Sequence, residues 1–147
     1  MVRVLANGCF DVLHVGHLDH LEEAKSLGDR LIVSLTLDVY VNKVKGLPVN
    51  SWEDRKQMLL ALKVVDAVVP SRHCWEAIYE VQPDIFVKGI DYLDSPDLNK
   101  ARRACDEVGA KLYITNSTKQ SSGEIIRRMK AVDLPPRGVG EGQYGIE

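Results

Sequence analysis

Short apolar runs alternate along the chain with longer segments in which apolar residues recur every three or four positions. The short runs predict buried strands, and the recurring pattern predicts amphipathic helices. In the first of the longer segments, Leu18, Leu21 and Ala24 recur at helical spacing, with charged residues between them. Gly28 follows this segment, where a helix C-cap is expected.

Five strands are predicted, at residues 2–6, 30–36, 67–69, 84–88 and 111–115. Helices are predicted at residues 17–27, 73–81, 101–108 and 121–131, and in a segment that starts at Ser51 and carries Leu62. Asp54, three residues after Ser51, makes a variant of the helix capping box. This alternation predicts an α/β fold, a doubly wound, mostly parallel five-stranded sheet with helices on both faces. Ligands of such sheets bind at the carboxyl ends of the strands, near a topological switch point.

The chain has 147 residues, the usual size of one domain. We expect residues 1–132 to form that domain. Residues 133–147 are rich in Pro and Gly and have no periodicity, so we expect a tail there and no second domain.

Charge and cysteine content narrow the function classes. Lys and Arg total 19 against 21 Asp and Glu, a net charge of −2, which gives no long-range attraction to nucleic acid or to an anionic membrane. No apolar stretch approaches the ~20 residues that a membrane span needs. The three cysteines are widely spaced without a CxxC pair, so we expect reduced thiols and a cytoplasmic protein.

The strongest chemical signal is the segment NGCFDVLHVGH at residues 7–17, between the first strand and the first helix. Gly8 allows close backbone approach to a phosphate, and the following helix offers free N–H groups to an anion. His14 and His17 can lie on one face of a helical turn, and Gly16 between them leaves room for a ligand. Two imidazoles there could stabilise charge that grows on a phosphoryl group. Alternatively, these histidines are structural or bind a metal, although HxxH without a third ligand is a poor zinc site.

The sequence HVGH resembles the HxGH signature of the HIGH-type nucleotidylyltransferase superfamily. The series NGCFDVLHVGH, AKSLGDRLIVSL, KGLPVNSWEDR, VDAVV and PDIFVKGIDY is similar to the adenylyltransferase domain of the bifunctional ADP-heptose synthesis enzymes. It also resembles glycerol-3-phosphate cytidylyltransferases, less closely around KGIDY. The resemblance implies that residues 1–132 are a nucleotidylyltransferase domain with a Rossmann-like fold.

The resemblance also implies a role for each matching residue. It gives catalytic roles to His14, His17 and Lys45, with both histidines contacting the triphosphate and stabilising the transition state at the α-phosphate. The residues expected at the nucleotide are Gly8, Cys9, Phe10, Gly16, Lys88, Gly89, Asp91, Ser121 and Ser122. The residues expected at the acceptor substrate are Asp11, Lys43 and Arg55. No residue is expected to be a metal ligand.

Several of these residues have a simpler reading. Lys43 and Lys45, placed in a loop after the second strand, could be solvated surface lysines. Asp11 could be an acid at a helix N-terminus, and Arg55 could form a surface ion pair with Glu53 or Asp54.

Two tryptophans and a cysteine also have simpler readings. Cys9 could be a nucleophile, which we disfavour because no histidine–acid pair is evident to activate it. Trp52 and Trp75 are expected in the core or an interface and not as platforms for a base.

The sequence departs from the related cytidylyltransferases near its last predicted helix. They carry RTEGIST where this chain has NSTKQSSGE, with Asn116 at the arginine and Gly123 at the second threonine. This weakens the cytidylyltransferase reading. We hypothesise that Lys119 replaces the missing positive charge, and unchanged turnover in Lys119→Ala would contradict that.

The expected reaction is transfer of a nucleoside monophosphate from an NTP to a phosphorylated small molecule, with Mg²⁺ bound to the NTP. ATP and a heptose-1-phosphate-like acceptor are favoured. The alternatives are CTP with glycerol-3-phosphate or another polyol phosphate, FAD synthesis from FMN, and a non-catalytic nucleotide-binding regulatory protein. The resemblance also implies a homodimer.

Overall fold

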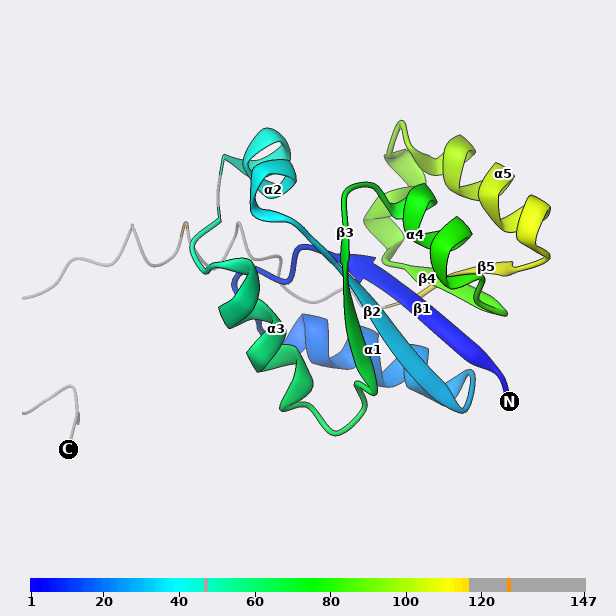
Figure 1. Cartoon of the computed structure of the whole chain (residues 1–147), viewed down its shortest axis with the longest axis horizontal. Coiled ribbons are helices and arrows are strands. Elements are labelled where there is room, and N and C mark those ends of the chain that lie inside the picture. The colour runs from blue at the N-terminus through cyan, green and yellow to red at the C-terminus, as the bar shows by residue number, and fades with distance from the viewer. Residues whose placement is uncertain (47, 117–126, 128–147) are drawn as a thin grey trace, which may run out of the picture.

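Five parallel strands form one sheet in the computed structural model, which describes residues 1–46, 48–116 and 127, without the side chains of residues 42–45 (Figure 1). The strand order is β3-β2-β1-β4-β5. The strands are β1 (Arg3–Gly8), β2 (Arg30–Thr36), β3 (Ala67–Ser71), β4 (Ile85–Lys88) and β5 (Lys111–Ile114). All four pairings between these strands are parallel, so the expected doubly wound parallel sheet is confirmed.

Helices cover both faces of the sheet. They are α1 (Val15–Ser26), α2 (Asp38–Lys45), α3 (Trp52–Leu60), α4 (Cys74–Val81), the 3₁₀ helix η1 (Ile90–Asp94) and α5 (Leu98–Val108). Two core clusters both take residues from β1, β2 and β4, and one joins them to α1 and α3, the other to α4 and α5. Figure 1 shows α1 and α3 on one side of the sheet and α4 and α5 on the other.

The alternation of side chains in β1 explains why Val4 to Ala6 form an unbroken apolar run. Val4 and Ala6 enter the cluster beneath α1 and α3, and Leu5 enters the cluster beneath α4 and α5. A central strand that is buried on both faces needs apolar residues at every position. β1 therefore sits in the middle of the sheet, with β2 on one side and β4 on the other.

The first helix begins earlier than its apolar spacing predicts. α1 starts at Val15 because His14 is its N-cap, whereas the pattern indicated a start near His17. The C-terminal end of α1 also differs from the expected glycine C-cap. The C-cap is Leu27, in right-handed conformation, and Gly28 is needed because a Cβ there would lie 2.7 Å from Val4 Cγ2.

The prediction that Lys43 and Lys45 lie in a loop is wrong, because both residues lie in α2. Asp38 gives this helix an acid in its first turn, which favours a helix N-terminus. Val41 is fully buried, and its N–H donates to the carbonyl of Leu37. Burial of Val41 thus stabilises this helix, and its eight residues are too few for the apolar pattern alone to identify it.

The other elements agree with the sequence within a few residues. Ser51 caps α3 as predicted, and its hydroxyl accepts from the Asp54 N–H. α3 ends at Leu60, before Leu62, and η1 was not predicted. The predicted helix at 121–131 and the tail at 133–147 lie outside the described residues, apart from residue 127.

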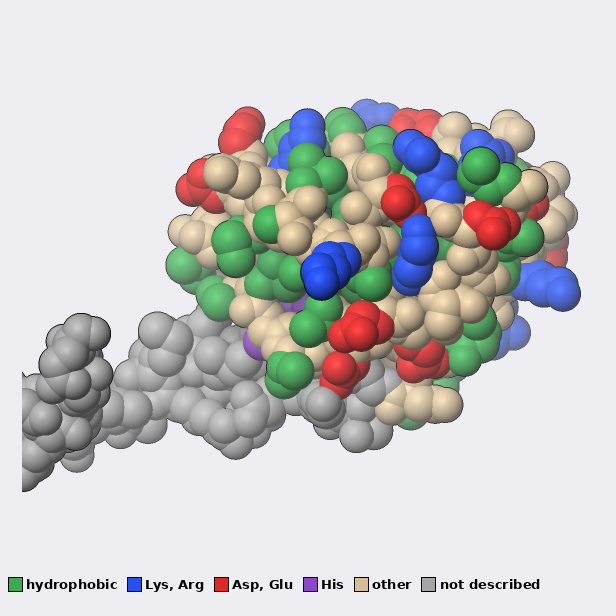
Figure 2. All heavy atoms as spheres, turned by 90° about the horizontal axis from the view of Figure 1, so that it is seen from below, with side chains coloured by type: hydrophobic (Ala, Val, Ile, Leu, Met, Phe, Trp, Pro, Cys, Tyr) green, Lys and Arg blue, Asp and Glu red, His purple; other side chains and the backbone are tan. Residues whose placement is uncertain are grey.

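Acidic and basic side chains are interspersed on the face of the molecule that Figure 2 shows. This distribution agrees with the small net charge of −2. Within the described part of the chain, none of the helices is long and apolar enough to span a membrane.

Candidate active site

The switch point of the sheet lies between β1 and β4. From β1 the chain moves outward to β2 and β3, and after returning it moves the other way from β4 to β5. β1 ends at Gly8 and β4 ends at Lys88, so both segments with predicted nucleotide contacts leave the sheet at this edge. α1 begins a few residues after β1, and its N-terminus lies at the same edge. These two segments and the N-terminus of α1 therefore lie at the edge where a parallel sheet binds ligands.

His14 and His17 form a reciprocal cap at the start of α1. The Gly16 N–H donates to Nδ1 of His14 over 3.0 Å, and the His14 N–H donates to Nδ1 of His17 over 3.3 Å. The two rings stack, with centroids 3.9 Å apart and planes at 29°. His14 thus takes the place of the N-cap Ser or Thr of an ordinary capping box, and His17 takes the place of its Glu.

This cap fixes the tautomer of both imidazoles. A ring nitrogen that accepts a hydrogen bond carries no proton, so the proton of each neutral ring sits on Nε2. Both neutral rings therefore carry the proton on Nε2 at a helix N-terminus, where the helix dipole also attracts an anion. This arrangement suits the stabilisation of charge on a phosphoryl group.

Phe10 packs against the ring of His17. Its ring is buried in the core and meets the ring of His17 edge-on, with centroids 5.2 Å apart. Gly8 is required here by packing, because a Cβ at this position would lie 2.9 Å from the Phe10 ring. Phe10 itself has a φ of 47°, so the chain turns sharply between β1 and α1.

Asn7 connects three strand ends, although the sequence indicated only that it breaks the first strand. Its Nδ2 donates to the Ser34 hydroxyl (2.8 Å) and to the Ser71 hydroxyl (3.0 Å), at the ends of β2 and β3. On the other side, Nζ of Lys88 donates to the Asn7 carbonyl over 3.2 Å and lies 4.6 Å from the centroid of the Tyr92 ring. Asn7 thus spans the switch point, and Lys88 is held against it.

Asp11 is fully buried and organises the chain before α3. Its carboxylate accepts from the N–H of Val49 (2.6 Å) and the N–H of Asn50 (3.0 Å). Asp11 precedes α1 by several residues, so the structure does not place it as an acid of that helix's first turn. Its contact with the acceptor stays a prediction.

Arg55 is 1% exposed, and its guanidinium joins several segments. It donates to the carbonyls of Cys9 (2.8 Å) and Thr36 (2.9 Å) and pairs with Asp38 at 2.5 Å. The alternative of a surface ion pair with Glu53 or Asp54 is wrong, because Asp38 is the partner and the guanidinium is buried. Contact between Arg55 and the acceptor phosphate stays a prediction.

The remaining predicted residues divide by what the structure describes. Gly89 and Asp91 follow Lys88, with Asp91 exposed at the start of η1. Lys43 and Lys45 are placed by the backbone of α2, and their side chains are outside the description. Ser121, Ser122, Gly123 and Lys119 lie outside the described residues.

His20 and Thr115 belong to this region, although neither was singled out from the sequence. Nδ1 of His20 lies 2.7 Å from the Thr115 hydroxyl. Burial, together with a smaller effect of the nearby Lys88, lowers the pKa of His20 to about 4 against the opposing effect of Glu23 and Asp91. His20 is therefore a neutral imidazole at physiological pH.

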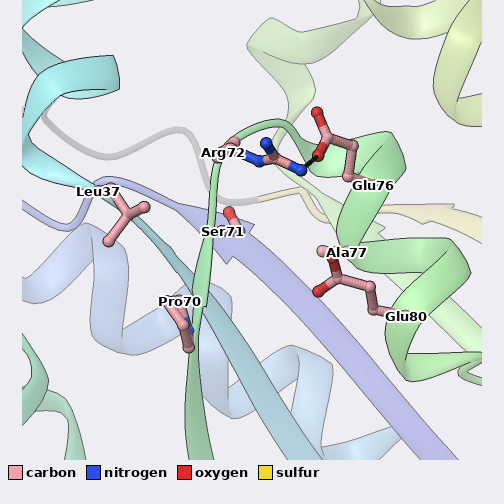
Figure 3. Close-up of a pocket in the computed structure, with 7 residues that line it drawn as sticks. All are labelled: Leu37, Pro70, Ser71, Arg72, Glu76, Ala77 and Glu80. Carbon is pink, nitrogen blue, oxygen red and sulfur yellow. Dashed lines mark ion pairs between the residues drawn. The ribbon is translucent and has the colours of Figure 1, made fainter.

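A separate shallow pocket of about 200 Å³ lies beside β3 (Figure 3). Its walls are Leu37, Pro70, Ser71, Arg72, Glu76, Ala77 and Glu80, with an ion pair between Arg72 and Glu76. It is smaller than the ~300–1,000 Å³ of typical ligand sites. Ser71, which accepts from Asn7, links this pocket to the switch point. The histidines do not line it, so we place the candidate site at the switch point.

The described side chains provide no ready metal centre. Among residues 1–46, 48–116 and 127, no group of three or more His, Cys, Asp or Glu is placed to hold a metal ion. The Asp11 carboxylate is already engaged by Val49 and Asn50.

Comparison with known proteins shows the family to which this chain belongs. A family model described as cytidylyltransferase-like matches residues 5–129. The chain belongs to the cytidylyltransferase-like family. This membership confirms the resemblance seen in the sequence and supports the expected enzyme class, a nucleotidyltransferase.

Curated relatives are similar over much of this chain. The "Bifunctional protein HldE" of Chromohalobacter salexigens is 50% identical over 93 residues, 60% of this chain and 20% of that protein. The protein of the same name from Nitrosococcus oceani is 45% identical over 128 residues, 84% of this chain and 27% of that protein. The chain thus spans about a quarter of the length of these relatives.

Solved structures share the fold of this family member. The lipopolysaccharide core biosynthesis protein from Thermoplasma volcanium has a TM-score of 0.68 at 31% identity, covering 82% of this chain and 99% of that one. The pantoate-beta-alanine ligase from Francisella tularensis has a TM-score of 0.58 at 16% identity, covering 83% of this chain and 61% of that one, a likeness of fold alone.

Proposed function

We propose that this chain transfers a nucleoside monophosphate from an NTP to a sugar phosphate and releases pyrophosphate. The observation that carries the proposal is the reciprocal cap of His14 and His17 at the N-terminus of α1, which occupies Nδ1 of both rings and so leaves Nε2 to carry the proton of each neutral imidazole. The similarity to the HldE proteins and to a lipopolysaccharide core biosynthesis protein favours a sugar phosphate as acceptor.

In the proposed reaction, an oxygen of the acceptor phosphate attacks the α-phosphorus of the NTP and forms a new P–O bond. The bond from the α-phosphorus to the oxygen that bridges to the β-phosphate breaks, and its electron pair leaves with pyrophosphate. The Nε2–H groups of His14 and His17 donate to the phosphoryl oxygens as their charge grows. Because phosphoryl transfer needs mainly positioning and charge stabilisation, no covalent intermediate with Cys9 is required.

Lys88 supplies a cation on the opposite side of the switch point. Its ammonium donates to the Asn7 carbonyl and lies over the Tyr92 ring, next to the ends of β1 and β4. We assign it to the phosphates or the ribose of the nucleotide. Mg²⁺ enters as the Mg·NTP substrate, in which it neutralises phosphate charge and holds the leaving pyrophosphate.

ATP and a heptose-1-phosphate-like acceptor are the substrates we favour, because NGCFD and KGIDY resemble the ADP-heptose adenylyltransferase domain, whereas the glycerol-3-phosphate cytidylyltransferases match less closely around KGIDY. CTP with glycerol-3-phosphate or another polyol phosphate, and ATP with FMN, are alternatives of the same class. The cytoplasmic location and the homodimer also stay predictions.

A pyrophosphate-release assay with Mg²⁺ tests the proposal directly. It combines ATP, CTP, GTP and UTP with heptose-1-phosphate, glycerol-3-phosphate, phosphocholine and FMN, and His17→Ala is the control. We expect release with ATP and heptose-1-phosphate that His17→Ala abolishes. Release with CTP and glycerol-3-phosphate alone would correct the substrates and keep the class. Nucleotide binding without release from any pair would contradict the enzyme and favour a nucleotide-binding regulatory protein.

A further inference from the structure

The proposed function uses the first two histidines of the α1 segment, and the structure contains a third on the same helix. His14, His17 and His20 follow one another at intervals of three residues, so they lie along one side of the helix. His14 and His17 contact each other, whereas His20 reaches across to Thr115, directly after β5. The third imidazole thus links α1 to the end of β5, the strand next to β4.

The contact of His20 continues to Lys88 through hydrogen bonds. Thr115 is fully buried, and its N–H donates to the Lys88 carbonyl over 2.9 Å. Nζ of Lys88 in turn donates to the Asn7 carbonyl. A series of contacts therefore runs from α1 through Thr115 to the Lys88 carbonyl, and from the Lys88 ammonium to the end of β1. This series lies at the edge of the sheet where the nucleotide is proposed to bind.

The protonation of the pair follows from the two contacts of the Thr115 hydroxyl. This hydroxyl lies 2.7 Å from Nδ1 of His20, and it donates to the Lys88 carbonyl over 3.5 Å. Because a hydroxyl has one proton to donate, it accepts from Nδ1–H of His20 when it donates to Lys88. His20 then donates through Nδ1, whereas His14 and His17 accept through Nδ1.

We propose that His20 is a positioning residue of the nucleotide site, which holds Lys88 in place through Thr115. This inference rests on the proposed function, because it takes Lys88 to bind the nucleotide. An uncharged imidazole is suited to this task, since a cation in its place would repel the Lys88 ammonium. The groups that act on it electrostatically are Lys88, Glu23 and Asp91.

The role of Nδ1 can be separated from that of Nε2 by choice of substitution. The amide nitrogen of His20→Asn can donate to Thr115 near the position of Nδ1, whereas His20→Leu removes the donor and keeps an apolar side chain of similar size. Tyr113→Phe is the matched control. The Tyr113 hydroxyl donates to Glu23 over 2.9 Å and so joins the same helix to the same strand without contacting Lys88.

The test is the dissociation constant of Mg·ATP, measured by calorimetry, together with kcat and KM where the acceptor is known. We expect His20→Leu to raise the Kd and the KM for ATP by about fivefold to tenfold, with kcat within about twofold. His20→Asn and Tyr113→Phe should both stay within about twofold of the unsubstituted protein. If His20→Leu does not fold, Thr115→Val removes the same bond from the other side and should give the same rise.

An unchanged Kd in His20→Leu, or an equal rise in Tyr113→Phe, would overturn the inference, the latter because a merely structural link explains it. The proposed function fails separately. Binding of Mg·ATP with no pyrophosphate release would contradict the enzyme while the Kd comparison still decides the role of His20. A protein that binds neither ATP nor CTP would overturn both.

Discussion

The backbone N–H of His14 donates to Nδ1 of His17, while the Gly16 N–H donates to Nδ1 of His14. Each histidine of the HVGH segment therefore has a structural role and a proposed chemical role at once. The two sequence readings, structural histidines or histidines that stabilise a phosphoryl group, are compatible, because capping uses Nδ1 and the proposed chemistry uses Nε2–H.

Substitution of His17 should separate these two roles. In His17→Asn the amide oxygen can still accept from the His14 N–H, so stability should be nearly kept while the Nε2–H donor is lost. We expect kcat to fall by about 10²–10³. His17→Ala should lose the same activity and also about 1 kcal/mol of unfolding free energy, because the cap is removed. Urea denaturation and the pyrophosphate assay measure the two effects, and full activity in His17→Asn would contradict the assigned role.

Substitution of Arg55 should act mainly on stability. Arg55→Met leaves the carbonyls of Cys9 and Thr36 without their buried donor, and we expect a loss of about 3 kcal/mol of unfolding free energy. Arg72→Ala is the control, because Arg72 forms an exposed ion pair with Glu76 and its loss should change stability by no more than about 0.5 kcal/mol. Equal losses in the two variants, in urea denaturation, would show that burial of Arg55 has no such effect.

The sheet could be predicted from sequence because its signals are local. β2 has the predicted bounds, since burial of its central residues on both faces produces an unbroken apolar run. α2 could not be predicted, because its stability depends on burial of Val41 and on the pair of Asp38 with Arg55. Such contacts join segments that are distant in sequence, and eight residues are too few for the apolar pattern alone to separate a helix from a polar loop.

The candidate site divides in the same way. The histidines and Lys88 could be found because they stand in a motif or directly after a buried strand. Asn7 and His20 could not, because a polar residue at a strand end or on a helix has a role only through its partners. Those partners, Ser71 and Thr115, lie 64 and 95 residues further along the chain.

Asp11 offers a test of how the segment before α3 is held. In Asp11→Asn the amide nitrogen replaces one oxygen that accepts from a backbone N–H of Val49 or Asn50, so one buried donor loses its acceptor. We expect a loss of about 1–3 kcal/mol of unfolding free energy in urea denaturation. Asp106→Asn, on the exposed side of α5, is the control and should be nearly neutral. Equal stability of both variants would contradict the assigned role of Asp11.

The pKa of His20 predicts a specific loss of stability in acid. The folded protein holds this pKa at about 4, against 6.5 for an unperturbed histidine. Well above pH 6.5 His20 is neutral in both states, so the group contributes nothing to the pH dependence there. As the pH falls from 6.5 towards 4, the unfolded state binds the proton first, and the folded state is destabilised by up to about 3 kcal/mol. In His20→Asn this contribution is absent, so the stability difference between the variant and the unsubstituted protein should shift in favour of the variant across that window. Urea denaturation at half-unit pH steps measures the difference, and a constant difference from about pH 7 to about pH 4 would show that His20 titrates normally in the folded protein.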